Sequence, residues 1–181
     1  MRLSAVASNR PSRAVIAGPG TADGAIVRHS LAKLLVFELA TRQIGIAADA
    51  VKEVLRAVSV TPLPGAPSVI EGVINLRGTA IPVFGLRARF GFPPSPVSPT
   101  DHFVVASTGK RTAAIRADRV IDLITLPIDE IDGIEAITSK QSPIAGVAKL
   151  PDGLVLIHDL ASFLTAAESE EINRAMEQVA L

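Results

Sequence analysis

Arg77 is the residue whose type and position most suggest a functional contact. It lies within residues 69–90, between two apolar runs rich in β-branched residues, and is followed by Gly78. Gly78 adopts positive φ without a steric cost, so the stretch predicts a strand, a tight turn and a returning strand. A guanidinium is a planar fork donor that matches a carboxylate. We expect Arg77 to contact another protein. Glu53 is either a partner of Arg77 inside the chain or an ordinary strand-edge charge. A solvated turn residue is the simpler alternative.

The other ionisable residues do not form a catalytic or metal-binding set. The chain has no cysteine, and its histidines, at 29, 102 and 158, do not share metal-ligand spacing. His158 and Asp159 are neighbours on a predicted strand, so their side chains should point to opposite faces. The acidic stretches 129–132 and 168–171 lack the spacing of a calcium loop. The sequence therefore predicts a protein that is not an enzyme and holds no cofactor or metal.

Composition limits the class of partner. Of the 181 residues 48% are hydrophobic but only 3% aromatic, and the formal net charge is zero. This balance indicates an aliphatic core and gives no basic footprint for nucleic acid. No apolar run reaches the roughly 18 residues of a membrane span, so we expect a cytoplasmic protein without direct membrane insertion.

The chain contains an internal repeat. Matching residues lie 69 positions apart before the proline-rich loop at 60–67 and 74 apart after it. The pairs include Leu35 with Val104, Ile46 with Ile115, Asp49 with Asp118, Glu53 with Asp122, Gly72 with Gly146, and Leu86 with Leu160. An ordered series of matches predicts two copies of one β unit.

Each copy has short strands separated by turn residues, a pattern that favours a small closed barrel. We predict a flexible arm over 1–33, a first barrel mainly over 34–90, and a proline- and serine-rich linker over 91–102. A second barrel mainly covers 103–164, and an amphipathic helix covers 166–181. Barrels of about 65 residues are marginal alone, so the two should share a core.

Local signals in the first copy leave one choice open. Asp49 is a suitable cap for a short helical turn, but residues 51–56 also fit a strand that continues to Arg56. Gly72 and Gly146 indicate a bulge or a close approach of two strands.

A set of motifs in this order resembles the CheW family of chemotaxis coupling proteins. The motifs are VKEV at 51–54, VTPLPGAP at 60–67, GVINLRG at 72–78, PV at 82–83 with LR at 86–87, Asp118 with Val120, and GVAKL at 146–150 leading to GLVL at 153–156. The resemblance covers about residues 34–165.

The resemblance implies a mainly β fold of two SH3-like five-stranded barrels around a shared aliphatic core, with short helical turns and a C-terminal helix. It implies a non-catalytic adaptor between the cytoplasmic tip of methyl-accepting chemoreceptors and the regulatory domain of the histidine kinase CheA. The adaptor would be cytoplasmic and recruited to membrane receptor arrays. The implied partner-binding residues are Arg77, Glu53, Val51, Gly72 and Asn75.

The chain also departs from the family pattern. Gly85 stands where the family commonly has aspartate, and the arm 1–33 and the acidic loop 128–141 are long. These features leave open a pathway that controls surface motility or a second-messenger enzyme. A small-ligand-binding barrel, with a sizeable internal cavity, is a further alternative.

Overall fold

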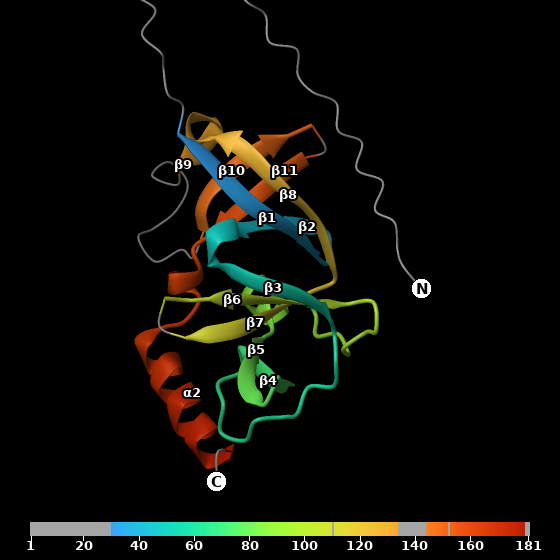
Figure 1. Ribbon diagram of the computed structural model, residues 1–181, viewed down its shortest axis with the longest axis vertical. Helices are drawn as coiled ribbons and strands as arrows, with labels where there is room; N and C mark the ends of the chain where they lie inside the picture. The colour runs from blue at the N-terminus through green and yellow to red at the C-terminus, as the bar shows by residue number, and fades with distance from the viewer. Residues whose placement is uncertain (1–29, 110, 134–143, 152, 180–181) are drawn as a thin grey trace, which may run out of the picture.

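The computed structural model describes residues 30–109, 111–133, 144–151 and 153–179. Figure 1 shows two β-barrels stacked along the long axis, with one helix against the lower barrel. The strands are β1 (Leu31–Leu39), β2 (Arg42–Ala47), β3 (Val51–Arg56), β4 (Ile70–Leu76), β5 (Thr79–Phe84), β6 (His102–Ser107), β7 (Thr112–Ala117), β8 (Arg119–Pro127), β9 (Ile131–Gly133), β10 (Ile144–Leu150) and β11 (Gly153–His158). The helices are η1 (Ala48–Ala50), α1 (Leu86–Arg89), η2 (Ile128–Glu130), η4 (Leu160–Ser162) and α2 (Ala166–Val179).

The two sheets are built from both halves of the chain. The upper barrel has the strand order β8-β1-β2-β11-β10-β9, and the lower barrel has β3-β6-β7-β5-β4. This division differs from the predicted barrel ranges, because β1 and β2 join strands of the second copy while β6 and β7 join strands of the first. The repeat placed equivalent strands correctly but does not say which copy each hairpin pairs with.

The equivalent strands make equivalent pairings. Strand β1 pairs antiparallel with β8, as β6 does with β3. Strand β2 pairs in parallel with β11, as β7 does with β5. The bulges also repeat, since the register shifts between Ile70 and Gly72 in β4 and between Ile144 and Gly146 in β10. The duplication inferred from residue spacing is therefore visible in the backbone.

Both faces of β1 contribute to apolar clusters, which explains why its sequence is almost continuously apolar. Leu34 and Val36 point into the upper barrel, while Leu35, Phe37 and Leu39 enter a cluster shared by both barrels. The shared cluster also contains lower-barrel residues and the buried positions of α2. A third cluster fills the lower barrel, with Phe103 and Ile74 among its members. Both interiors hold packed side chains, which disfavours the ligand-binding-barrel alternative.

Three features differ from the predictions, and the choice left open for residues 51–56 is settled. Strand β1 begins at Leu31, inside the predicted arm; residues 1–29 lie outside the described residues. The segment 51–56 is a strand, and Asp49 lies within η1, whose first turn has no side-chain cap. Part of the predicted acidic loop forms η2 and β9, so the upper barrel has six strands, and residues 134–143 lie outside the described residues.

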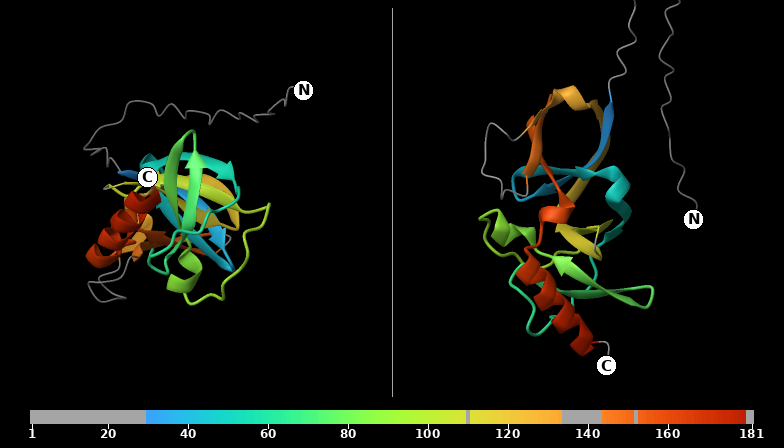
Figure 2. Two further views of the ribbon diagram at one scale, coloured as in Figure 1. Left: turned by 90° about the horizontal axis from the view of Figure 1, so that it is seen from below. Right: turned by 90° about the vertical axis from the view of Figure 1, so that its left-hand side faces the viewer.

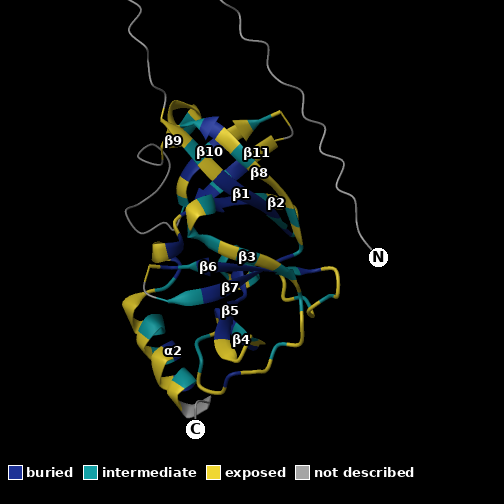
Figure 3. Cartoon of the chain, in the orientation of Figure 1, coloured by how far each residue is buried: buried dark blue, intermediate teal, exposed yellow. Residues whose placement is uncertain are grey.

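Helix α2 packs along the side of the lower barrel (Figure 2). Ile172 and Ala175 are buried, and Figure 3 shows most of the opposite face exposed. The helix start is fixed by Thr165, whose hydroxyl and backbone N–H both donate to the Glu168 carboxylate. Arg89 of α1 donates to the same carboxylate at 2.7 Å. These bonds tie α2 to the lower barrel.

Candidate partner-binding site

The turn between β4 and β5 presents Arg77 in an unusual backbone conformation. Leu76 pairs with Thr79, so Arg77 and Gly78 are the two turn residues. Their φ values are +52° and +86°. Positive φ at both positions is typical of a type I′ hairpin turn, whose twist matches the flanking strands. The Asn75 side-chain oxygen accepts the Gly78 N–H at 2.8 Å, so Asn75 shapes the turn.

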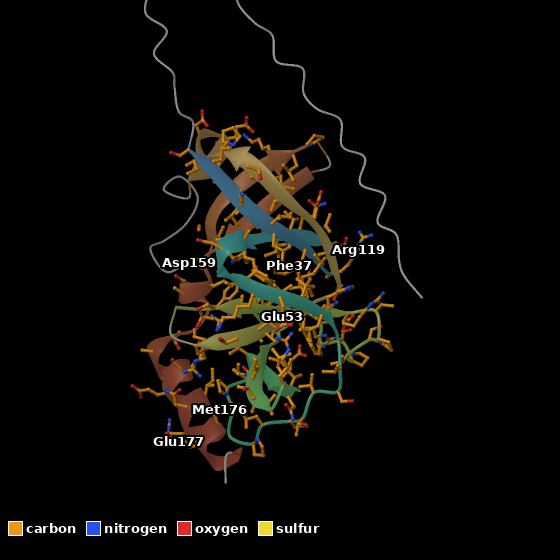
Figure 4. All side chains as sticks on the ribbon, viewed as in Figure 1. Phe37, Glu53, Arg119, Asp159, Met176 and Glu177 are labelled. Atoms are coloured by element: carbon orange, nitrogen blue, oxygen red, sulfur yellow. The ribbon has the colours of Figure 1, made fainter. Side chains whose placement is uncertain are left out.

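Arg77 pairs with Glu53 and remains exposed. Its Nη2 donates to Glu53 Oε2 at 2.9 Å, and the two side chains are 80% and 30% exposed. The ion pair between Arg77 and Glu53 that the sequence analysis considered is therefore present. Strands β3 and β4 lie at opposite ends of the lower sheet, so the pair also links those two ends as the sheet curls. Figure 4 shows Glu53 on β3 at the front of the molecule.

Gly72 supports the hairpin from the other end of β4. Its φ is +149°, and a Cβ atom there would lie 2.2 Å from the Thr61 carbonyl oxygen. Thr61 and Val73 exchange two backbone hydrogen bonds at this crossing. The close approach predicted for Gly72 is therefore present, and it requires glycine. Gly146 is similar, since a Cβ there would lie 2.6 Å from the Ile131 side chain.

Val51 lies apart from the exposed turn. It is half-buried and packs against the core shared by the two barrels. The structure thus brings Arg77, Glu53 and Asn75 together on one surface, with Gly72 behind them. A contact of Val51 with a partner stays a proposal.

A second group of charged residues, which the sequence reasoning did not assign, fastens the barrels together. Arg87 of α1 donates through Nη2 to both carboxylate oxygens of Asp118, each at 2.6 Å. Asp118 Oδ2 also accepts the backbone N–H of Ala40, in the β1–β2 turn, at 2.7 Å. Asp118 lies where the chain crosses from β7 in the lower barrel to β8 in the upper. This single carboxylate therefore joins elements of both.

Arg116 forms the most buried charged cluster in the described residues. It is 3% exposed, and it donates to Asp101 Oδ2 at 2.8 Å and Glu71 Oε2 at 3.0 Å. Burial lowers the pKa of Arg116, but its bonds to Glu71 and Asp101 raise it above the usual guanidinium value overall. Arg116 also donates to the backbone carbonyls of Ser95 and Pro96. In the sequence, the feature that pointed to this cluster was a charged residue within the otherwise apolar segment 113–117.

Glu71 explains the glycine at position 85. A Cβ atom on Gly85 would lie 2.4 Å from Glu71 Oε1. The Glu71 carboxylate, from β4, therefore fills the space beside position 85. A side chain at that position would collide with it, and glycine avoids the collision. Asp159, the equivalent residue in the second copy, accepts the Ala161 N–H at the start of η4, whereas no side chain caps α1 after Gly85.

His158 and Asp159 do not form a dyad. His158 is buried, and its ring lies against Phe90 and Phe163 at centroid distances of 4.8 and 5.7 Å. The exposed Asp159 carboxylate accepts the Ala161 N–H and the Ser162 hydroxyl at the start of η4. Within the described ranges no three His, Asp or Glu side chains gather as metal ligands would. Nor does that part of the chain hold a helix long and apolar enough to span a membrane.

Comparison with known proteins identifies the architecture. The family model described as "CheW-like domain" matches residues 33–168. The chemotaxis protein CheW of Rhizobium meliloti is 27% identical over 140 residues, covering 76% of this chain and 90% of that protein. Protein FrzA of Myxococcus xanthus is 35% identical over 95 residues, or 52% of this chain and 59% of FrzA.

A solved structure agrees with the sequence relatives. The crystal structure of the scaffolding protein TtCheW from Thermoanaerobacter tengcongensis matches with a TM-score of 0.68 and 31% sequence identity. The match covers 76% of this chain and 95% of the TtCheW chain. With its duplicated SH3-like barrels and the family match over most of its length, this chain belongs to the CheW-like family.

Proposed function

We propose that this chain is an adaptor that couples the cytoplasmic tip of a chemoreceptor to the regulatory domain of a CheA-type histidine kinase. The observation that supports this most directly is Arg77, 80% exposed at a turn and held in positive φ. Left-handed backbone costs a non-glycine residue about 1–2 kcal/mol. Strain of this kind persists where a function needs the side chain. Arg77 with Glu53 and Asn75 forms the proposed kinase- or receptor-binding surface.

The Arg77–Glu53 pair suits recognition better than stability. An exposed ion pair contributes only about 0.2–1 kcal/mol to folding, which does not outweigh the strain of the turn. Glu53 holds the guanidinium outward, so that its other N–H groups are accessible to a carboxylate of the partner. Membership in the family supports the same role.

Exposed aliphatic residues offer a second surface, for a receptor helix. Val54 on β3 is 40% exposed, and Leu123 on β8 is 58% exposed. The internal repeat makes them equivalent positions, and each lies on the edge strand of its sheet. An amphipathic helix binds by placing its apolar face on such residues. Val120, Val147 and Leu150 of the second copy are weaker candidates, because all three are half-buried, and Val120 and Leu150 pack against core clusters.

The experiment is a binding assay with two purified partners, the regulatory domain of the CheA-type kinase and a fragment carrying the receptor tip. We expect Arg77→Ala to weaken at least one interaction and Leu123→Asp to weaken receptor binding specifically. If neither partner binds the full chain, the adaptor proposal is wrong.

One observation favours a second candidate pathway. FrzA carries a name other than chemotaxis protein, and it shows 35% identity to this chain. In this second candidate, the same adaptor surfaces act in a chemosensory pathway that does not control flagella. The binding assay separates the two candidates when it is run with kinase and receptor pairs from each pathway in the source organism.

A further inference from the structure

We propose that the linker between the two copies is a preformed polyproline ligand, which binds a protein domain with an aromatic-lined groove. The linker holds four prolines within seven residues, at positions 93, 94, 96 and 99. Proline fixes its own φ near −65°, and the residue before a proline is pushed to extended backbone. These two constraints act on every residue from Phe92 to Pro96. They favour the left-handed polyproline II helix, which has three residues per turn.

Burial along the linker has this period of three. Phe92, Ser95 and Ser98 are half-buried, and the two residues after each of them are exposed. One edge of the helix therefore faces the barrel and two edges face solvent. Pro93 and Pro96 lie on one outer edge, and Pro94 and Val97 lie on the other.

Each barrel-facing residue has its own anchor. The Arg42 guanidinium lies over the Phe92 ring, 5.4 Å from its centroid. The Ser95 carbonyl accepts from the buried Arg116 at 2.9 Å. The Ser98 backbone N–H donates to Asp101 at 3.0 Å.

Arg116 and Asp101 are also bonded to each other, so the same buried ion pair holds the second and third anchors. A linker that served only to connect α1 to β6 would not require a buried cation bonded to its carbonyls.

The two solvent-facing edges of the linker form a ridge between two hollows in the surface. A hollow of about 510 Å³ is lined by Pro94, Pro96 and Val97 among others, and one of about 360 Å³ by Val97 and Pro99 with residues 57–59. Val97 is 38% exposed, and its neighbour Val58 across the smaller hollow is 47% exposed. In Figure 1 the loop projects on the side of the lower barrel opposite α2. A partner can therefore reach the ridge from both sides.

The chemistry of the ridge selects the partner. Domains of the SH3 and WW type bind polyproline helices in grooves lined by aromatic side chains, and a preformed helix lowers the entropy that binding must remove. A second copy of this chain is a poor occupant, because the chain has no Tyr or Trp to line such a groove. An amphipathic helix would need a groove, and the linker presents a ridge.

The test uses the full chain and the purified SH3- and WW-type domains encoded by the source organism, titrated one by one with a fluorescence readout. We expect saturable binding to at least one domain, with competition by a synthetic peptide of residues 92–98. Replacing Pro93 and Pro96 together by alanine should weaken binding at least tenfold. Val97→Asp, on the other exposed edge, should do the same without removing a proline.

The matched control replaces the exposed Pro62 and Pro64, in the loop before β4, by alanine. This variant should bind as the unaltered chain does. The proposal fails if no domain gives saturable binding, or if the control weakens binding as much as the linker variants do. The linker variants should retain the melting temperature and the kinase and receptor binding proposed above. The two proposals can therefore fail independently.

Discussion

Replacing Arg77 by alanine should remove partner binding while leaving the fold almost unchanged. The lost ion pair with Glu53 joins side chains that are 80% and 30% exposed, so it contributes about 0.2–1 kcal/mol. Alanine meets nearly the same strain at positive φ, so the turn neither gains nor loses much. For a chain of this size 1 kcal/mol shifts Tm by about 2–4 °C, so we expect a fall of at most about 4 °C.

Binding to the kinase domain or the receptor tip should change far more. An arginine at the centre of an interface typically contributes at least about 2 kcal/mol, which is roughly thirtyfold in Kd. Calorimetric titration measures this loss, and differential scanning measures Tm on the same samples. Arg77→Gly sharpens the comparison, because glycine also relieves the strained φ and should keep or raise Tm while binding is lost.

Arg119 provides the matched control. It is 66% exposed, pairs with Glu38 at 2.7 Å, and lies at the start of β8 (Figure 4). Arg119→Ala should therefore lower Tm about as much as Arg77→Ala and leave the titration unchanged. A fall in Tm beyond about 8 °C for Arg77→Ala would make Arg77 a structural residue. Equal weakening of binding by both variants would show a general charge effect instead of a site.

The other predictions concern the residues that hold the site in place. Gly72→Ala should lower Tm by roughly 4–8 °C, because its Cβ would overlap a backbone carbonyl oxygen 2.2 Å away and the strain costs about 2 kcal/mol. Gly85→Asp should destabilise by placing a second carboxylate against Glu71, and adding Glu71→Ala should recover most of the loss by returning one carboxylate to Arg116; no recovery in thermal melts would contradict this pairing. Burial raises the pKa of Glu168, but its hydrogen-bond donors lower it below the usual value overall, so its stabilisation is present above the unfolded-state pKa and is lost as pH falls through the folded-state pKa. The Tm deficit of Glu168→Gln at pH 7 should therefore shrink in acid, and a deficit independent of pH would contradict the assignment.

The sequence predicted the turn that carries Arg77 better than it predicted how the strands are connected. Gly78 after Arg77 indicated the turn, and the spacing of the repeat located equivalent strands in both copies. The spacing of the repeat did not predict that strands of one copy pair with strands of the other. An apolar hairpin such as β1–β2 satisfies the same pattern in either barrel, and only tertiary packing decides which barrel it joins.

The buried ionic contacts were missed for a related reason. Arg116 in an apolar strand was a visible anomaly, but its partners Glu71 and Asp101 lie 45 and 15 residues away, and no local rule connects them. Gly85 was noticed as a departure, yet its explanation depends on a side chain from a neighbouring strand. Local patterns predict elements, whereas contacts between distant charges emerge only when the sheets are assembled.

The exchange of hairpins has a consequence for how an adaptor can work. Each barrel contains strands from both copies, so neither half of the chain carries the complete strand set of a barrel. The relative placement of the barrels is fixed by the apolar cluster that they share and by the Asp118 contacts at the crossing. The Arg77 surface on the lower barrel and Leu123 on the upper barrel are therefore held in a constant geometry. An adaptor that contacts two partners at once benefits from such rigidity, because the binding of one partner then positions the chain for the other without a further loss of conformational entropy.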